Sequence, residues 1–255
     1  NIIIGLAALV LIVLLAGFVQ KGGASNSNRQ PATLSTPGVT KNLVLPPYAD
    51  KADVISLGTQ IDPSTKQAVE GLAFIHYKEE GAGVGKGSTS VQNTCYSFLG
   101  KGAKWKTVEP WLANATNPSG LSDSFVLSNL GLNISKWESA ALGKNILGDR
   151  IDGTVDGADT VSPDGKNEVY FGGISDPGVI AVTIVWGNFS GPPQNRVLVE
   201  WDQVYNTAFS WSSSGQAGKM DFENIATHEL GHTVGLGHPG DSCTEETMYR
   251  FSSLG

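Results

Sequence analysis

Short apolar segments between turn residues predict several strands. Residues 52–57 and 71–77 are bounded by Gly, Asp and Pro and indicate a strand or two. Residues 105–108, followed by 110–112, predict a first strand of the region after residue 100. Residues 179–186 form the clearest strand in the chain, and residues 196–201 follow a Gly-Pro-Pro turn as the expected antiparallel partner.

Helical spacing predicts two helices. Residues 121–137 carry an apolar stripe, with Ser122 or Asp123 as a plausible N-cap. The stripe comprises Phe125, Leu127, Leu130, Ile134 and Trp137. Residues 224–227 lead into a second helix, in which Ile225, Leu230 and Val234 can pack on a sheet.

The first fifty residues differ in composition from the rest. Residues 2–19 form an apolar run without charge, of a length between a signal-peptide core and a membrane span. Residues 1–20 are therefore predicted to be a signal peptide or a membrane anchor, and the protein to be exported. Residues 21–50 are rich in Ser, Asn, Gln, Pro and Thr, which predicts a flexible linker.

Composition and charge exclude some functions. The chain is 40% hydrophobic, which is enough to bury a core. Its net charge of −7 argues against a nucleic-acid partner, whose binding surface would be basic. The 32 glycines indicate many turns and short strands. Residues 81–87 do not form a phosphate-binding loop, because Lys86 precedes Gly87 where Ser or Thr is needed, and they predict a flexible connector.

One motif specifies a chemistry through its spacing, and it runs from His228 to His238. His228 and His232 are four residues apart, so on a helix both rings can reach one metal ion. Gly235 allows the helix to stop and the backbone to turn, which brings His238 round as a third ligand. Three protein ligands leave a fourth position for water, as in catalytic zinc sites. Glu229 is offset from the ligands and is the candidate general base.

One alternative to this ligand set stays open, in which Glu245 or Glu246 replaces His238 as third ligand. His76 is the one histidine outside the motif, and without supporting spacing its expected role is structural or at the surface.

This motif resembles the extended zinc motif of the metzincin metalloproteases. Those enzymes place a methionine turn beneath the metal, and Met248 lies ten residues after His238. Residues 238–241 are similar to serralysins, whereas the adjacent pair Met248 and Tyr249 is similar to matrixins.

The resemblance implies an α+β fold of metzincin type. We expect a twisted mixed β-sheet backed by two long helices, with the zinc-binding helix under a cleft along the edge strand and the N-terminal hydrophobic helix outside the domain. A peptide substrate would pair with that edge strand. Residues 51–90 would be a pro-segment or N-terminal extension and residues 91–255 the catalytic domain. Because metzincins continue well beyond the methionine turn, the resemblance also implies that this domain is C-terminally truncated.

The activity that the resemblance implies is that of a secreted or membrane-tethered zinc endopeptidase. Zn²⁺ would be held by His228, His232 and His238, with Glu229 as general base. We expect an extracellular or cell-surface monomer that acts on proteins or peptides and contacts a membrane only if its N-terminal segment is retained. The rival interpretation is a non-catalytic exported surface or adhesion protein that keeps a zinc-binding, protease-like fold.

Two further features concern stability and latency. Cys95 and Cys243 are the only cysteines and are expected to form a disulfide in an oxidising compartment, although Cys95 as a thiolate blocking the zinc is the alternative. Residues 149–159, with Asp164, interleave carboxylates and glycines, which suits Ca²⁺. Such clusters are also ordinary solvated turns.

Overall fold

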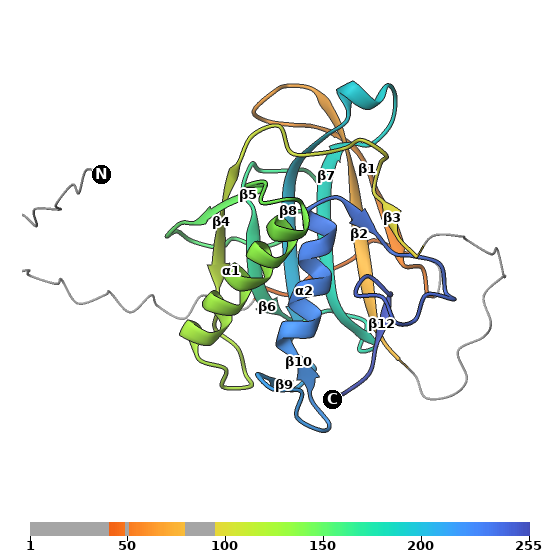
Figure 1. Cartoon of the computed structure of the whole chain (residues 1–255). Coiled ribbons are helices and arrows are strands. Elements are labelled where there is room, and N and C mark those ends of the chain that lie inside the picture. The colour runs from red at the N-terminus through yellow and green to blue at the C-terminus, as the bar shows by residue number, and fades with distance from the viewer. Residues whose placement is uncertain (1–40, 49–50, 80–94) are drawn as a thin grey trace, which may run out of the picture. The chain divides into compact units, whose positions relative to one another are not determined.

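An eight-stranded mixed sheet carries two helices on one face (Figure 1). The sheet order is β1-β2-β7-β8-β6-β4-β5, and β12 pairs with β2 off this path. The strands of this sheet are β1 Val54–Ile61, β2 Ala68–Lys78, β4 Glu109–Asn114, β5 Leu147–Arg150, β6 Glu168–Gly172, β7 Val179–Asn188, β8 Val197–Asn206 and β12 Phe251–Ser252. The helices are α1 Asp123–Ala140 and α2 Phe222–Thr233. The predicted α+β class with a mixed sheet and two helices is confirmed.

Shorter elements complete the chain. Strands β9 Trp211–Ser212 and β10 Met220–Asp221 pair with each other and precede α2 in the chain. Strand β11 Leu236–Gly237 follows α2 and pairs with β3 Ser97–Phe98. A 3-10 helix, η1 Pro193–Asn195, forms the turn between β7 and β8.

This computed structural model describes residues 41–48, 51–79 and 95–255. The predicted signal peptide or anchor, with its apolar run 2–19, lies outside these residues. The predicted flexible connector over residues 81–87 lies outside them too. Within the described ranges, no helix combines the length and apolarity that a membrane crossing requires.

The β7–β8 pair forms the centre of the sheet, as the sequence predicted. Eight Cα pairs join these strands in antiparallel register, from Ala181 opposite Tyr205 to Asn188 opposite Val197. Nine of the ten residues of β7 are buried, which explains why this segment reads as a continuous apolar run. One face of the strand packs on the helices. The other packs Val182, Ile184 and Trp186 into a second core.

The segment 51–79 belongs to the same sheet as the rest of the described chain. β1 and β2 pair antiparallel, and β2 in turn pairs antiparallel with β7 over residues 70–77. The domain boundary expected near residue 90 therefore does not separate two sheets. The end of the expected linker also packs against the domain, because Leu43 bridges Ile174 and both are buried.

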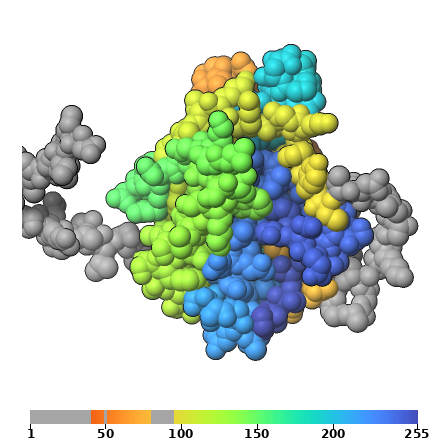
Figure 2. Space-filling view, in the orientation of Figure 1, coloured from red at the N-terminus to blue at the C-terminus, as the bar shows by residue number. Residues whose placement is uncertain are grey.

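Helix α1 forms where its apolar stripe and cap predicted it. The Ser122 hydroxyl accepts a hydrogen bond from the Phe125 amide and so satisfies one of the free N–H groups of the first turn. Leu130 and Ile134 are buried, and α1 packs beside α2. Figure 2, in the same orientation, shows α1 and the C-terminal segments covering this face, while residues of the β1–β2 hairpin emerge only at its margins.

The first strand, predicted over residues 105–108 and 110–112, forms only in its second part, since β4 runs from Glu109 to Asn114. Trp105 is used for a tertiary contact instead, because its indole N–H donates to the Thr233 carbonyl at 2.7 Å, at the end of α2. Trp105 therefore contacts the end of α2 and does not extend the sheet.

Candidate metal centre

Helix α2 and the turn after it position the three histidines of the motif. The helix begins at Phe222, after the Asp221 carboxylate, which accepts from the Glu223 amide. His228 and His232 lie one turn apart on it. Gly235 has a φ of 105°, which a residue without Cβ adopts freely, and the chain turns back there as predicted.

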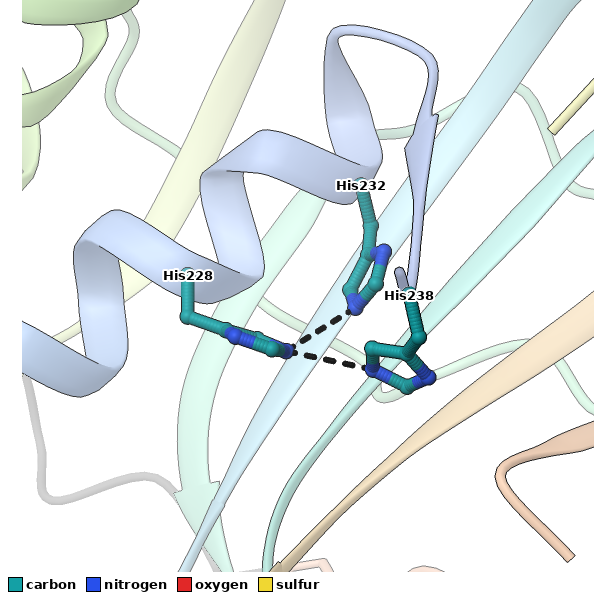
Figure 3. Close-up of side chains that lie close together, drawn as sticks. All are labelled: His228, His232 and His238. Carbon is teal, nitrogen blue, oxygen red and sulfur yellow. Dashed lines mark hydrogen bonds between the residues drawn. The ribbon is translucent and has the colours of Figure 1, made fainter. Parts of the chain in front are cut away.

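The three imidazoles converge on one point (Figure 3). Nε2 of His228 lies 3.2 Å from Nε2 of His238 and 3.2 Å from Nε2 of His232. All three residues are buried, with His238 the most exposed at 9%. The structure thus brings together all three predicted ligands in a group that could hold a metal ion. Glu245 and Glu246, the alternative third ligands, are exposed and lie outside this group.

Backbone carbonyls set the tautomers of two of the rings. Nδ1 of His228 donates to the Thr247 carbonyl at 2.7 Å, and Nδ1 of His232 donates to the Leu236 carbonyl at 2.8 Å. A neutral imidazole that donates through Nδ1 has its lone pair on Nε2. Both lone pairs therefore point at the common centre.

Asp53 lies beside the third ring. Its Oδ2 atom is 3.4 Å from Nδ1 of His238, which is longer than a good hydrogen bond, and Nδ1 has no other partner. The contact with His238 holds the pKa of the Asp53 carboxyl below its ordinary value. Asp53 therefore remains ionised and favours a positive charge at this site.

Burial keeps the first two histidines neutral. It lowers the pKa of both His228 and His232 well below 6.5, because removing a ring from water disfavours its charged form. Neutral imidazoles are the form that binds a metal.

Glu229 lies next to the ligands but is fully buried. Its Oε2 atom accepts from the Thr183 hydroxyl of β7 at 2.6 Å, and its Oε1 atom lies 3.0 Å from Nδ1 of His76 on β2. Burial raises the pKa of this carboxyl. Burial also lowers the pKa of His76 to about 3, so this ring is neutral where it contacts the Glu229 carboxyl group.

Met248 packs directly beneath the helix. A Cβ placed on Gly231 would lie 2.2 Å from the Met248 sulfur, so α2 and the methionine turn approach as closely as a glycine permits. The preceding Thr247 carbonyl is the one that orients His228. The methionine singled out from the sequence therefore packs against α2 at Gly231, between His228 and His232 in the chain.

The disulfide between Cys95 and Cys243 is formed, with the two Cα atoms 5.5 Å apart. The prediction of this bond is confirmed. The alternative, a Cys95 thiolate that blocks the metal, is wrong for this structure because the sulfur is already bonded.

The acidic loop forms a second, smaller group. Asp159, Asp164 and Glu200 bring carboxylate oxygens within 4.8 Å of one another. Glu200 is 1% exposed, and its Oε1 atom has no hydrogen-bond partner. Asp149 and Asp152 of the predicted stretch are exposed and lie outside this group. Calcium binding here stays a prediction.

Three residues of the site were missed from the sequence. His76, Thr183 and Asp53 lie on or beside β1, β2 and β7, and each contacts a residue of the motif. No spacing links them to it, because long-range strand pairing brings them there. The only available signal was that all three fall within predicted strands, over residues 52–57, 71–77 and 179–186.

Comparison with protein-family models and with curated proteins finds no match for this chain. Fold and site together define an α+β protein with a buried group of three histidines suited to a metal ion.

Proposed function

We propose that the protein is a zinc-dependent endopeptidase of metzincin type. The observation that carries the proposal is the convergence of three Nε2 atoms, two of them with tautomers set by backbone carbonyls. The carboxylate of Glu229 adjoins this group. The order of elements from β4 to α2 and the position of Met248 support the same family.

The donor set fits zinc. Zinc with tetrahedral nitrogen ligands at about 2.0–2.1 Å has those ligands roughly 3.3 Å apart. The two Nε2 separations of 3.2 Å are close to this value. When bound, zinc would supply a Lewis acid with an open fourth position, in which water has a pKa of about 7.

The residues of the chain would then supply orientation and proton transfer. Glu229 is the proposed general base, which accepts the proton of the attacking water on a carboxylate oxygen and passes it to the leaving amine. Thr183 holds one oxygen of this carboxylate. Asp53 would orient His238, as outer carboxylates orient metal-binding histidines elsewhere. The scissile C–N bond breaks as the amine takes up the proton.

The test is Glu229→Ala, with Glu246→Ala as its control. Glu246 is exposed, whereas Glu229 is buried beside the ligands. We expect Glu229→Ala to keep its zinc and to lose cleavage of a quenched peptide by a factor of roughly 10² to 10⁴. A chelator should abolish cleavage by the parent. Unchanged turnover in Glu229→Ala would remove this mechanism.

A second candidate function is metal binding without catalysis, in an exported surface or adhesion protein. The complete burial of Glu229 and the engagement of both its oxygens favour it. A zinc-loaded chain that cleaves neither casein nor peptides would support this alternative.

A further inference from the structure

A cavity of about 420 Å³ opens where the loop before β4 meets the C-terminal ends of α1 and α2 (Figure 1). The loop contributes residues 104–108, the end of α1 and the turn after it contribute Ala141 and residues 144–146, and the end of α2 contributes Val234. Its volume falls within the range of small-molecule sites, about 300–1,000 Å³. No residue of the histidine group or of the acidic group lines it, so this is a separate site.

Three partly buried apolar residues form the floor of this cavity. Trp105, Ile146 and Val234 line it and also pack against the main core. The indole N–H of Trp105 donates to the Thr233 carbonyl at 2.7 Å, which satisfies the only polar group of that side chain and fixes its ring. Trp105 therefore offers ring surface to the cavity, which suits an aromatic or other apolar body.

Exposed cations surround this floor. Lys104, Lys106 and Lys144 line the cavity, and no aspartate or glutamate does. The whole chain carries 24 acidic and 17 basic side chains, so a lining of three lysines without an acid runs against its overall charge. Within the described ranges, none of the three ammonium groups has a carboxylate partner. The cavity is therefore complementary to a negative charge.

Two carboxylates close to the cavity in the chain have partners of their own. Glu109 accepts from the Thr107 hydroxyl, and Glu138 accepts from two backbone amides after α1. Lys144 follows the end of α1, where a cation also interacts favourably with the helix carbonyls. The other two lysines belong to no helix, so helix stabilisation does not account for them.

The apolar surface continues beside the cavity. Leu142, the residue after Ala141, is 93% exposed and has a φ of 60°, a conformation that favours glycine. Val108 lines the cavity and is 47% exposed. Both side chains extend the apolar surface that a ligand can cover at this place.

We propose that this cavity binds a small anionic ligand with an apolar body, of the class of aromatic carboxylates. The apolar body would lie on Trp105 and its neighbours, and the lysines would hold the carboxylate. Lysine is a point charge on a flexible stem, so three of them accept one anionic group without a fixed geometry. This inference depends neither on zinc nor on the proposed peptidase function.

The test is calorimetric titration of the zinc-loaded full chain with three probes that share one ring system. The probes are naphthoate, the corresponding neutral alcohol and the corresponding ammonium compound. We expect naphthoate to bind with a Kd of roughly 1 μM to 1 mM, as suits a ligand of this size. The alcohol should bind roughly tenfold more weakly, and the ammonium compound should not bind, because the lysines repel it. Added salt should weaken naphthoate binding and leave binding of the alcohol unchanged.

Matched lysine variants locate the binding. Lys104→Gln with Lys106→Gln should weaken naphthoate binding roughly tenfold, and binding of the alcohol should stay at the parent value. The control is Lys66→Gln, which removes an exposed lysine from the turn between β1 and β2, outside the cavity. It should bind naphthoate like the parent. Because all of these lysines are exposed, the substitutions leave the core intact.

Several results would overturn the proposal. These are no binding of naphthoate, equal affinity for naphthoate and the alcohol, and equal losses in the double variant and in Lys66→Gln. Lysine-dependent binding of an acidic peptide that contains one leucine, without binding of naphthoate, would also overturn it and would assign this surface to an acidic protein partner. Each result leaves the test of the peptidase through Glu229→Ala unaffected.

Discussion

Nδ1 of His76 lies 3.0 Å from Oε1 of Glu229, although 153 positions separate the two residues along the chain. His76 is 1% exposed and Glu229 is fully buried, so neither group can exchange this partner for water. The contact links β2 to the metal-binding helix. It therefore matters for the stability of the fold around the histidine group.

We predict that His76→Ala destabilises the chain by about 1–3 kcal/mol, because it leaves a buried carboxylate oxygen without its donor. The control is His76→Asn, whose amide nitrogen occupies nearly the position of Nδ1 and can still donate. The measurement is the free energy of unfolding in denaturant, at constant zinc. Equal losses in the two variants would mean that ring packing, and not the hydrogen bond, holds the strand.

The second prediction concerns the third ligand. His238→Ala removes one of the converging Nε2 atoms and should weaken zinc binding more than about 100-fold, beyond the 10–100-fold typical of losing an outer partner. Asp53→Asn, which alters only such a partner, should fall within that smaller range. Glu246→Ala should bind zinc like the parent. Zinc content of His238→Ala equal to that of the parent, measured by competition with a chelator, would place the third ligand elsewhere.

Local signals predicted most of the site, whereas non-local pairing decided the rest. The spacing of His228 and His232, with a glycine at 235, was enough to predict how the three rings meet, because helix geometry and one turn determine it. The cap at Ser122 and the β7–β8 pair are local in the same way. The sequence also marked 71–77 as a strand but could not name its neighbours.

The role of His76 depends on register, which no local pattern specifies. His76 pairs with Ala181 across β2 and β7, and a shift of one residue would turn its ring to the opposite face of the sheet. Strand β6 was missed because its five residues are all buried and give no alternation. The orientation of the His76 ring and the presence of β6 are both decided by how the strands pair in the folded sheet.

The third prediction is that loss of the disulfide weakens the fold. Cys95 and Cys243 are 148 positions apart, so their bond closes a long loop and restricts the unfolded chain. Replacing both by Ser should cost about 2–5 kcal/mol of the free energy of unfolding. Zinc stoichiometry should stay at the parent value, because neither sulfur belongs to the histidine group. Reductant applied to the parent should reproduce the loss, and it should leave the double variant unaffected.

The fourth prediction joins calcium to pH through the acidic loop. Burial raises the pKa of Asp159 to about 6 and that of Glu200 to about 9. Between the ordinary carboxyl pKa near 4 and these values, the folded chain binds more protons than the unfolded chain, so its stability falls as pH rises through this window. A divalent cation would replace those protons. Calcium should therefore bind better at high pH.

We expect calcium to raise the melting temperature at pH 8 and to have little effect at pH 5. At a hundredfold excess over its Kd, the added stability would be about 2.7 kcal/mol. Glu200→Gln should abolish the calcium effect, since it removes the buried carboxylate with the unpartnered oxygen. Asp149→Asn is the control, because Asp149 is exposed and lies outside the carboxylate group. An equal calcium shift at both pH values, or in both variants, would show that calcium acts elsewhere and that the loop is an ordinary solvated turn.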